Sequence, residues 1–200
     1  YLRQGREWAR YASIKARRIT GNVQDAISLF SKLSSFVYRR YLDYAVYDSL
    51  REMKSKIMFQ VKQNGYENNM KLGAGGIREI EFFGQIFQLI RRGVDHSLKR
   101  KKILSILDVL ASEDYVPENV TWELKSAYIF LRLTENHIQE YGDAQTHELP
   151  GEGYARTALY VSMGFESWDE FEKTLYTHMQ RVHEHFSELL ADGKNDKKQN

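Results

Sequence analysis

The sequence predicts an all-α protein built as a bundle of about seven or eight helices. Apolar residues recur at spacings of three and four along most of the 200 residues, which is the periodicity of amphipathic helices. The chain contains only two prolines, and proline is the residue that most disrupts the hydrogen-bond ladder of a helix. No pair of strand-like segments and no fixed-period repeat interrupts this pattern.

The helices are expected in a simple order along the chain. They cover residues 4–19, 25–30, 36–61 (as one helix or as 36–44 and 45–61), 77–92, 98–112, 117–141, 154–163 and 168–190. A glycine just past the last helical residue is a common stop, and Gly65, Gly93 and Gly164 stand at such places. Ser167 and Glu170 form a capping box, in which the two side chains satisfy free amides at the start of the last helix.

The expected core residues lie on one face of each helix. On the first helix Trp8, Tyr11, Ala12 and Ala16 are expected on one side, and the arginines, Arg10 among them, mostly around the rest. On the later helices the expected core residues are Ile77, Ile80, Phe83, Phe87, Ile90, Ile103, Leu104, Leu107, Leu110, Leu124, Ala127, Tyr128, Leu131 and Leu133. We expect residues 1–190 to form one helical domain and the polar residues 191–200 to form a disordered tail.

Composition and charge exclude several classes of function. The 29 Lys and Arg residues nearly balance the 27 Asp and Glu residues, for a net charge of +2. Total charge therefore does not favour nucleic acid or a membrane as a partner, and no apolar run approaches the roughly 20 residues of a membrane span. The absence of cysteine excludes disulfides and fits a reducing cytosol. We expect a cytoplasmic protein, and the start at Tyr1 without an initiator methionine suggests part of a longer one.

The most informative segment is a glycine-rich stretch that runs directly into a helix, from Lys71 to Phe82. Free amides and the helix dipole point outward at such a helix start and can receive an anion. The alternative is a turn that only precedes a core helix. Arg78 and Glu81 lie three residues apart and can form an ion pair.

Other polar groups carry weaker signals. The histidines at 178, 183 and 185 lack the spacing of a metal-binding helix, so no metal site is expected in this chain. The segment 143–150 is dense in hydrogen-bonding groups, and we expect its side chains to hold it in place rather than to bind a ligand.

Six segments in a fixed order resemble one family, the glutamate-ammonia-ligase adenylyltransferases, bifunctional enzymes that modify glutamine synthetase. The segments are 5–12 with 15–17, 36–44, 71–82, 88–91, 127–132 and 143–150. This resemblance covers nearly all of the chain to about Leu190.

The resemblance implies both an architecture and an activity. The family carries two nucleotidyltransferase units in tandem, each with a catalytic palm of the DNA polymerase β type followed by a helical domain. The N-terminal unit removes AMP from a glutamine synthetase tyrosine by phosphorolysis, and the C-terminal unit adds AMP from ATP. The sequence of residues 71–82 resembles the corresponding segment of the N-terminal unit, so the chain is expected to be the helical domain of that unit. The implied cofactors are Mg²⁺ and ATP or ADP, and the implied partners are glutamine synthetase and the PII signal protein, whose uridylyltransferase has a related helical domain.

The sequence departs from the family at the catalytic palm. The Gly-Ser turn, the Asp-x-Asp strand and the later aspartate of that palm, which bind the metal ions, do not occur here. We therefore expect no catalytic residue and no metal ligand in this chain, and no activity from the chain alone. The palm is expected to precede Tyr1.

The resemblance and the chemistry of the glycine loop together suggest a phosphate-binding wall of the active-site cleft. The first candidates are Lys71, Gly73, Gly75, Gly76 and Arg78, with Glu81 orienting Arg78. Weaker candidates lie on the first helix, at Arg6, Arg10, Lys15 and Arg17. The competing hypothesis is a non-catalytic module that docks glutamine synthetase or the PII protein, with the glycines forming a tight packing turn. A nucleic-acid-binding domain is a third and weaker alternative, because no helix-turn-helix pattern accompanies the basic clusters.

Overall fold

The computed structural model describes residues 7–38, 45–64, 69–91, 93–142 and 146–195. Within these residues the chain forms eight α-helices and one short 3₁₀ helix, η1, with no named strand. They are α1 (Glu7–Ile14), α2 (Val23–Val37), α3 (Ala45–Asn64), α4 (Ile77–Arg91), η1 (His96–Leu98), α5 (Ile103–Ser112), α6 (Glu118–Gly142), α7 (Tyr154–Ser162) and α8 (Trp168–Asn195). The predicted all-α bundle is confirmed. None of the helices in the described part of the chain is long and apolar enough to cross a membrane.

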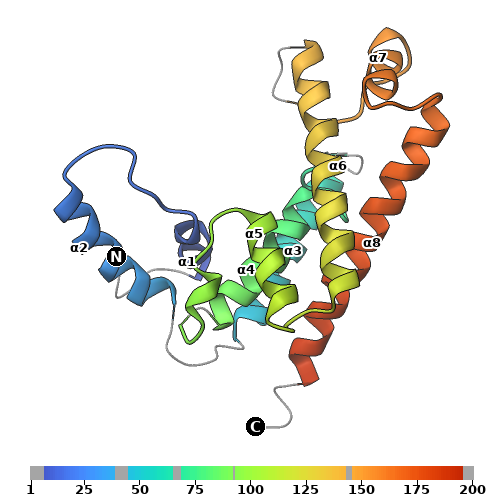
Figure 1. Cartoon of the computed structure of the whole chain (residues 1–200). Helices are drawn as coiled ribbons and strands as arrows, with labels where there is room; N and C mark the ends of the chain where they lie inside the picture. Colours follow the sequence, from blue (N-terminus) through green and yellow to red (C-terminus); the bar gives the residue numbers. More distant parts are fainter. Residues whose placement is uncertain (1–6, 39–44, 65–68, 92, 143–145, 196–200) are drawn as a thin grey trace.

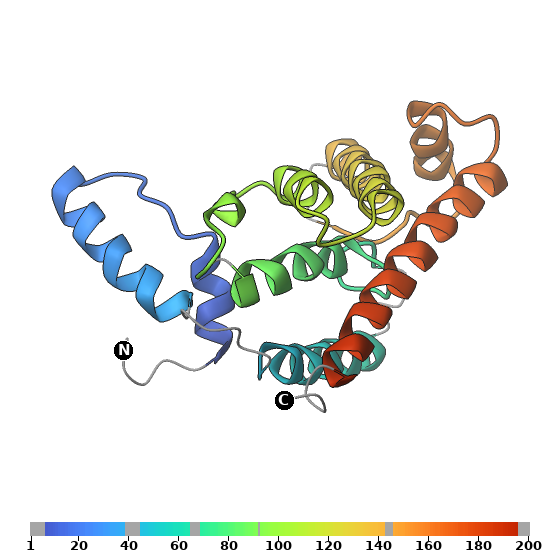
Figure 2. The same ribbon diagram turned by 60° about the horizontal axis from the view of Figure 1, so that its bottom comes forward.

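Helix α4 forms the centre of the bundle (Figure 2), with α1, α3, α5, α6 and α8 around it. Twelve of its 15 residues are buried, because a helix that is apolar on most of its circumference must be covered on most sides. Its buried amide Gln88 donates from Nε2 to the carbonyl oxygens of Leu98 and Arg100, at 2.9 and 2.7 Å. These bonds bind the segment after η1 to the core.

The two longest helices, α6 and α8, lie side by side along one edge of the bundle (Figure 1), and α7 packs near their far ends. Phe171, Val182 and Phe186 on α8 are fully buried. At the other edge α2 packs against α1 and stands apart from the rest of the bundle in both views.

Two helix boundaries differ from the prediction, and in both places a distant side chain bonds to the backbone. The first helix ends at Ile14 rather than at residue 19, and the Ala16 carbonyl beyond it accepts from Lys101 Nζ at 2.8 Å. The predicted helix over 98–112 is divided into η1 and α5, and Gln88 donates to the Leu98 and Arg100 carbonyls at the division.

Helices α2 and α8 are longer than predicted. The prediction of 25–30 is wrong because α2 runs from Val23 to Val37, capped by Asn22 Oδ1, which accepts from the Gln24 amide at 2.7 Å. Helix α8 continues past the expected end at Leu190 to Asn195, and residues 196–200 lie outside the described residues. Residues 39–44, where one helix or two were left open, also lie outside them.

Other local predictions are confirmed, with two exceptions in detail. Helix α3 ends at Asn64 and α4 spans the predicted segment. The Glu170 amide donates to Ser167 Oγ at 3.2 Å, as a capping box requires, but the Glu170 carboxylate accepts from the Glu166 amide instead of the Ser167 amide. Leu133 was expected in the core and is 47% exposed.

One pH-dependent contribution to stability arises from His178 on α8. Its ring lies 4.9 Å from the Phe130 ring between centroids, and burial lowers the pKa of His178 below its ordinary value of 6.5. The folded chain therefore binds a proton at His178 less tightly than the unfolded chain does. The contribution of the neutral ring to stability is complete above the unfolded pKa and is lost as the pH falls through the lowered pKa of the folded chain.

We expect His178→Phe to reduce the loss of melting temperature between about pH 7.5 and about pH 5.5, because it removes this linkage. The measurement is thermal unfolding of both proteins at the two pH values. His96→Gln, at an exposed histidine, is the matched control and should behave as wild type. An unchanged pH dependence in His178→Phe would contradict the assignment.

Candidate functional site

The glycine loop before α4 is a turn that satisfies its own backbone. Asn69 Oδ1 accepts from the amides of Lys71 and Leu72 at 3.1 and 3.0 Å. The amide of Gly73 donates to the Asn69 carbonyl at 2.7 Å, and the amide of Gly76 donates to the Gly73 carbonyl at 3.0 Å. An Asn side chain that closes a turn in this way replaces backbone contacts.

Two further amides of this segment are occupied as well. Gly75 donates to Glu79 Oε2 at 3.0 Å, and Ile77 donates to the Met70 carbonyl at 2.9 Å. The amides of all four loop candidates, Lys71, Gly73, Gly75 and Gly76, thus have acceptors inside the chain. The loop in this conformation does not present them to a phosphate, because each amide carries a single hydrogen.

Two of the glycines are required by close packing. Gly75 has φ +74°, and a Cβ there would lie 1.8 Å from the Met179 carbonyl oxygen on α8. A Cβ on Gly76 would lie 2.5 Å from the Met70 carbonyl oxygen. Only glycine permits these approaches, so the loop is a packing turn that seats the start of α4 against α8.

Beneath this loop the Glu79 carboxylate joins four parts of the fold. Its side chain is 8% exposed and lies 3.3 Å from Lys54 Nζ on α3 and 3.2 Å from His183 Nδ1 on α8. The Lys54 ammonium also lies 4.7 Å from the centroid of the Phe186 ring. A buried carboxylate is stable only when it is paired in this way. No local pattern in the sequence indicates this cluster, because Lys54 and His183 are remote from Glu79 in sequence.

We expect Glu79→Gln to lower the free energy of unfolding by about 2–3 kcal/mol. Glutamine can still accept from the Gly75 amide, but it leaves the Lys54 ammonium without its anionic partner. The measurement is urea unfolding of the purified chain. Glu52→Gln is the matched control, since Glu52 pairs with Lys56 on the solvent side of the same helix as Lys54 and should change stability little. Equal effects of the two substitutions would contradict this account of the cluster.

A second carboxylate, Glu81, pairs with two cations from different parts of the fold. Its Oε1 lies 2.6 Å from Lys15 Nζ, beyond the end of α1, and its Oε2 lies 3.3 Å from Arg78 Nη1. The predicted Arg78–Glu81 pair is confirmed. The Arg78 guanidinium also lies 5.5 Å from the Phe82 ring centroid, and its Nε is buried without a hydrogen-bond partner in the described structure.

Lys15 and Arg78 face an open cavity of about 350 Å³ between α1, α3 and α4, here called the α1–α4 cavity. Its lining residues are Tyr11, Ala12, Lys15, Met53, Ile57, Arg78, Phe82 and Gln85. The volume lies within the range of about 300–1,000 Å³ that is usual for small-molecule sites. The lining combines two cations and two polar side chains, Tyr11 and Gln85, with apolar residues. Such a lining suits an anion that carries an apolar group.

The other predicted candidates do not line this cavity. Arg10 was expected on the outer side of its helix and is instead buried, with Nε and Nη2 donating to the Val37 carbonyl at 3.3 and 3.2 Å. It therefore joins α1 to α2. Lys71 is half-buried in the loop and Arg17 is exposed beyond α1, and neither is a lining residue. Arg6 lies outside the described residues.

The polar segment that begins at residue 143 is held in place by its own contacts, as predicted for the part that the structure describes. His147 Nδ1 lies 2.7 Å from Glu135 Oε1, and Arg132 pairs with the other oxygen of Glu135. The His147 carbonyl accepts from the Met70 amide at 3.0 Å. This segment therefore supports the glycine loop from the α6 side.

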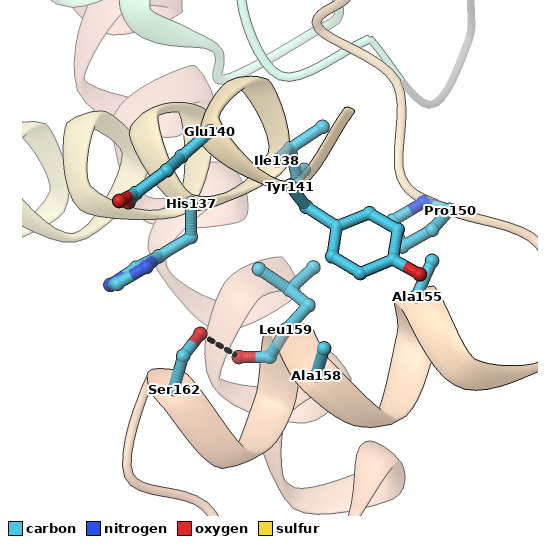
Figure 3. Close-up of a pocket in the computed structure, with 9 residues that line it drawn as sticks. All are labelled: His137, Ile138, Glu140, Tyr141, Pro150, Ala155, Ala158, Leu159 and Ser162. Atoms are coloured by element: carbon cyan, nitrogen blue, oxygen red, sulfur yellow. Dashed lines mark hydrogen bonds between the residues drawn. The ribbon is translucent and has the colours of Figure 1, made fainter. Parts of the chain in front are cut away.

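A second cavity, of about 250 Å³, lies between α6 and α7 and contains none of the predicted site residues (Figure 3). Its lining residues are His137, Ile138, Glu140, Tyr141, Pro150, Ala155, Ala158, Leu159 and Ser162. The Ser162 hydroxyl donates to the Leu159 carbonyl at 2.9 Å. With no lysine or arginine in its wall, this cavity does not suit a phosphate.

No group of three or more His, Asp or Glu side chains that could hold a metal ion occurs within the described ranges. His183 pairs with Glu79, and His185 Nε2 lies 2.6 Å from Glu123 Oε2.

Comparison with known proteins shows which family the chain resembles. A sequence model of the family described as GlnD PII-uridylyltransferase matches residues 50–190. The chain is 46% identical over 191 residues to the bifunctional glutamine synthetase adenylyltransferase/adenylyl-removing enzyme of Nitrosococcus oceani, an alignment that covers 96% of the chain and 20% of that relative. The enzyme of the same description from Pseudomonas aeruginosa is 44% identical over 196 residues, with 98% and 20% covered. The chain thus spans about a fifth of the length of these curated relatives.

Proposed function

Because the chain belongs to the GlnD PII-uridylyltransferase family, we propose that it is the helical domain of the adenylyl-removing half of a bifunctional glutamine synthetase adenylyltransferase. The similarity of nearly the whole chain to enzymes of that description supports the proposal. The complete enzyme would remove AMP from a glutamine synthetase tyrosine in one half and add it from ATP in the other. A cytoplasmic location accords with the cysteine-free sequence.

In this proposal the chemistry takes place on a palm domain outside the chain. The Mg²⁺ ions and the nucleotide would be held there, since the described residues offer no fitting cluster of metal ligands. In the removing reaction an orthophosphate oxygen attacks the phosphorus of the AMP group. The bond from that phosphorus to the tyrosine oxygen breaks, the tyrosine oxygen takes a proton, and ADP leaves.

The observation that carries the proposal is the convergence of Lys15 and Arg78 on one carboxylate at the α1–α4 cavity. Glu81 neutralises only one of the two charges, so the site keeps a net positive charge for a phosphate. It also orients Arg78, whose planar guanidinium can contact two phosphate oxygens at once.

The glycine loop contributes through packing in this proposal. Gly75 lets the loop seat against α8, and Gly76 lets it fold closely over the Met70 carbonyl, so that Arg78 lies one residue inside the start of α4. Lys71 and Arg17 remain candidates for longer-range attraction of the anionic substrate, since they are outside the cavity wall. The proposal is tested by the rate at which the full-length enzyme, with and without the Arg78 guanidinium, releases ADP from AMP-modified glutamine synthetase.

A docking module for glutamine synthetase or the PII signal protein is the second candidate function. The observation in its favour is an exposed apolar stripe on α6. Trp122, Ile129 and Leu133 are 67, 49 and 47% exposed and share one face, because spacings of seven and four residues return to the same side of a helix. Exposed aromatic and aliphatic side chains in a line are typical of helix-docking surfaces. Unchanged phosphorolysis after removal of Arg78 would make this the leading function.

A further inference from the structure

Two basic runs that are distant in sequence form one surface beside α1. Arg17 and Arg18 follow α1, and a second run follows η1. Lys101 Nζ donates to the Ala16 carbonyl at 2.8 Å and joins the two runs. We call this surface the basic platform, and its residues, all exposed, are Arg17, Arg18, Lys99, Arg100, Lys101 and Lys102. The net charge of the whole chain is only +2, so the platform is a local concentration of positive charge.

An open cavity of about 290 Å³ adjoins the platform between α1 and α2. It lies apart from the α1–α4 cavity and shares no lining residue with it. Its lining residues are Ser13, Ile14, Ala16, Phe30, Leu33, Ser34, Val37, Tyr38, Lys99 and Lys101. The lining includes no carboxylate, and two platform lysines form part of its rim.

The apolar side of this cavity continues along α2. Phe30, Ser34 and Val37 line the cavity, and Val23 and Ile27, which are 56 and 57% exposed, fall on the same helical face. Spacings of three and four residues keep all five on one side of α2. Val37 is 1% exposed and closes the inner end of the cavity, so the accessible track from Val23 to Ser34 covers about three turns, or roughly 17 Å at a rise of 1.5 Å per residue.

We propose that the basic platform and this track of α2 bind an acidic amphipathic helix of a partner protein. The carboxylates of that helix would lie over the platform, and its apolar side chains would enter the cavity and follow the track. Charge complementarity and the length of the track both match a helix that binds in a groove through residues at spacings of three and four.

The chemistry of the cavity favours a peptide over nucleic acid. Single-stranded nucleic acid needs open aromatic faces on which bases stack. Here the Lys101 ammonium lies 5.9 Å from the centroid of the Phe30 ring. Tyr38 is the second ring of the lining, and the four aliphatic lining residues outnumber the two rings. Aliphatic walls accept leucine-like side chains.

The test is fluorescence anisotropy with the full-length protein that carries this chain. The probe is a fluorescein-labelled peptide of glutamate and leucine, with leucine at spacings of three and four. Wild type should bind it saturably. Lys99→Glu should weaken binding about tenfold, whereas Lys173→Glu on α8, an exposed lysine with the same change of charge, should not. Ser34→Glu, which places a carboxylate in the cavity wall, should also weaken binding, and Ser28→Glu elsewhere on α2 should not.

Three results would overturn the proposal. The first is equal binding of a peptide with the same composition but scrambled leucines. The second is an equal loss of affinity in Lys99→Glu and Lys173→Glu, which would indicate attraction by total charge. The third is tighter binding of a labelled oligo-dT that the same variants weaken, which would indicate nucleic acid. Lys99 is exposed outside any helix, so its substitution should leave folding intact, as circular dichroism would check.

Discussion

Substituting Arg78 with alanine in the full-length enzyme is expected to lower phosphorolytic deadenylylation of glutamine synthetase by about 100-fold. Arg78 would supply donors to the phosphate oxygens as charge shifts during transfer, and alanine supplies none. The melting temperature should change little, because the Arg78 side chain is 43% exposed and ion pairs of this exposure contribute little to stability. The measurement is the rate of ADP release from AMP-modified glutamine synthetase, with thermal unfolding of each protein.

The chain offers a closely matched control for this prediction. Arg181 and Glu184 on α8 form a pair with the same three-residue spacing and the same 3.3 Å separation as Arg78 and Glu81. Arg181→Ala should leave the rate unchanged. Arg78→Lys should recover only part of the activity, since lysine cannot make the two-point contact. Wild-type rates in Arg78→Ala, or a loss that follows a lowered melting temperature, would argue against the proposed role.

Gly75→Ala is expected to destabilise the chain by about 4 kcal/mol or more. The new Cβ would lie 1.8 Å from the Met179 carbonyl oxygen, which is main chain and cannot move unless α8 shifts. The residue would also be held at φ +74°, a conformation that non-glycine side chains adopt at a cost. Urea unfolding of the purified chain measures the effect, and failure to fold would be its extreme form.

Two other glycines separate the clash from the backbone strain. Gly21 has φ +92° but no atom within 4 Å of a new Cβ, so Gly21→Ala should cost only about 1 kcal/mol. Gly151 has open space and no positive φ, and Gly151→Ala should change stability by less than about 0.5 kcal/mol. If Gly75→Ala cost no more than Gly21→Ala, the loop could not be packed against α8 as described.

These two predictions concern different parts of one segment. The glycines fix the position of the start of α4, and this position places the proposed phosphate-binding side chain of Arg78. A glycine substitution is therefore expected to reduce both stability and activity, whereas an Arg78 substitution should reduce activity alone. This contrast distinguishes a packing role from a ligand-binding role within a segment of twelve residues.

The sequence by itself determined the all-α class, the position of helix α4 and the family. Helix α4 could be predicted to within one residue, because periodic apolar residues and the flanking glycines act through neighbours in the chain. The Arg78–Glu81 pair follows from the same local geometry. The family resemblance rested on segments along the chain, and the comparison with known proteins confirmed it.

Only the tertiary structure decided which groups meet across helices. Arg10 was expected outside, but α2 covers it and supplies the Val37 carbonyl. The contact of Glu79 with His183 joins residues 104 positions apart. Local periodicity describes the faces of one helix, whereas a contact between helices depends on how all of them pack. For this reason the sequence indicated the candidate cations, and only the tertiary structure showed that Lys15 and Arg78 meet at Glu81.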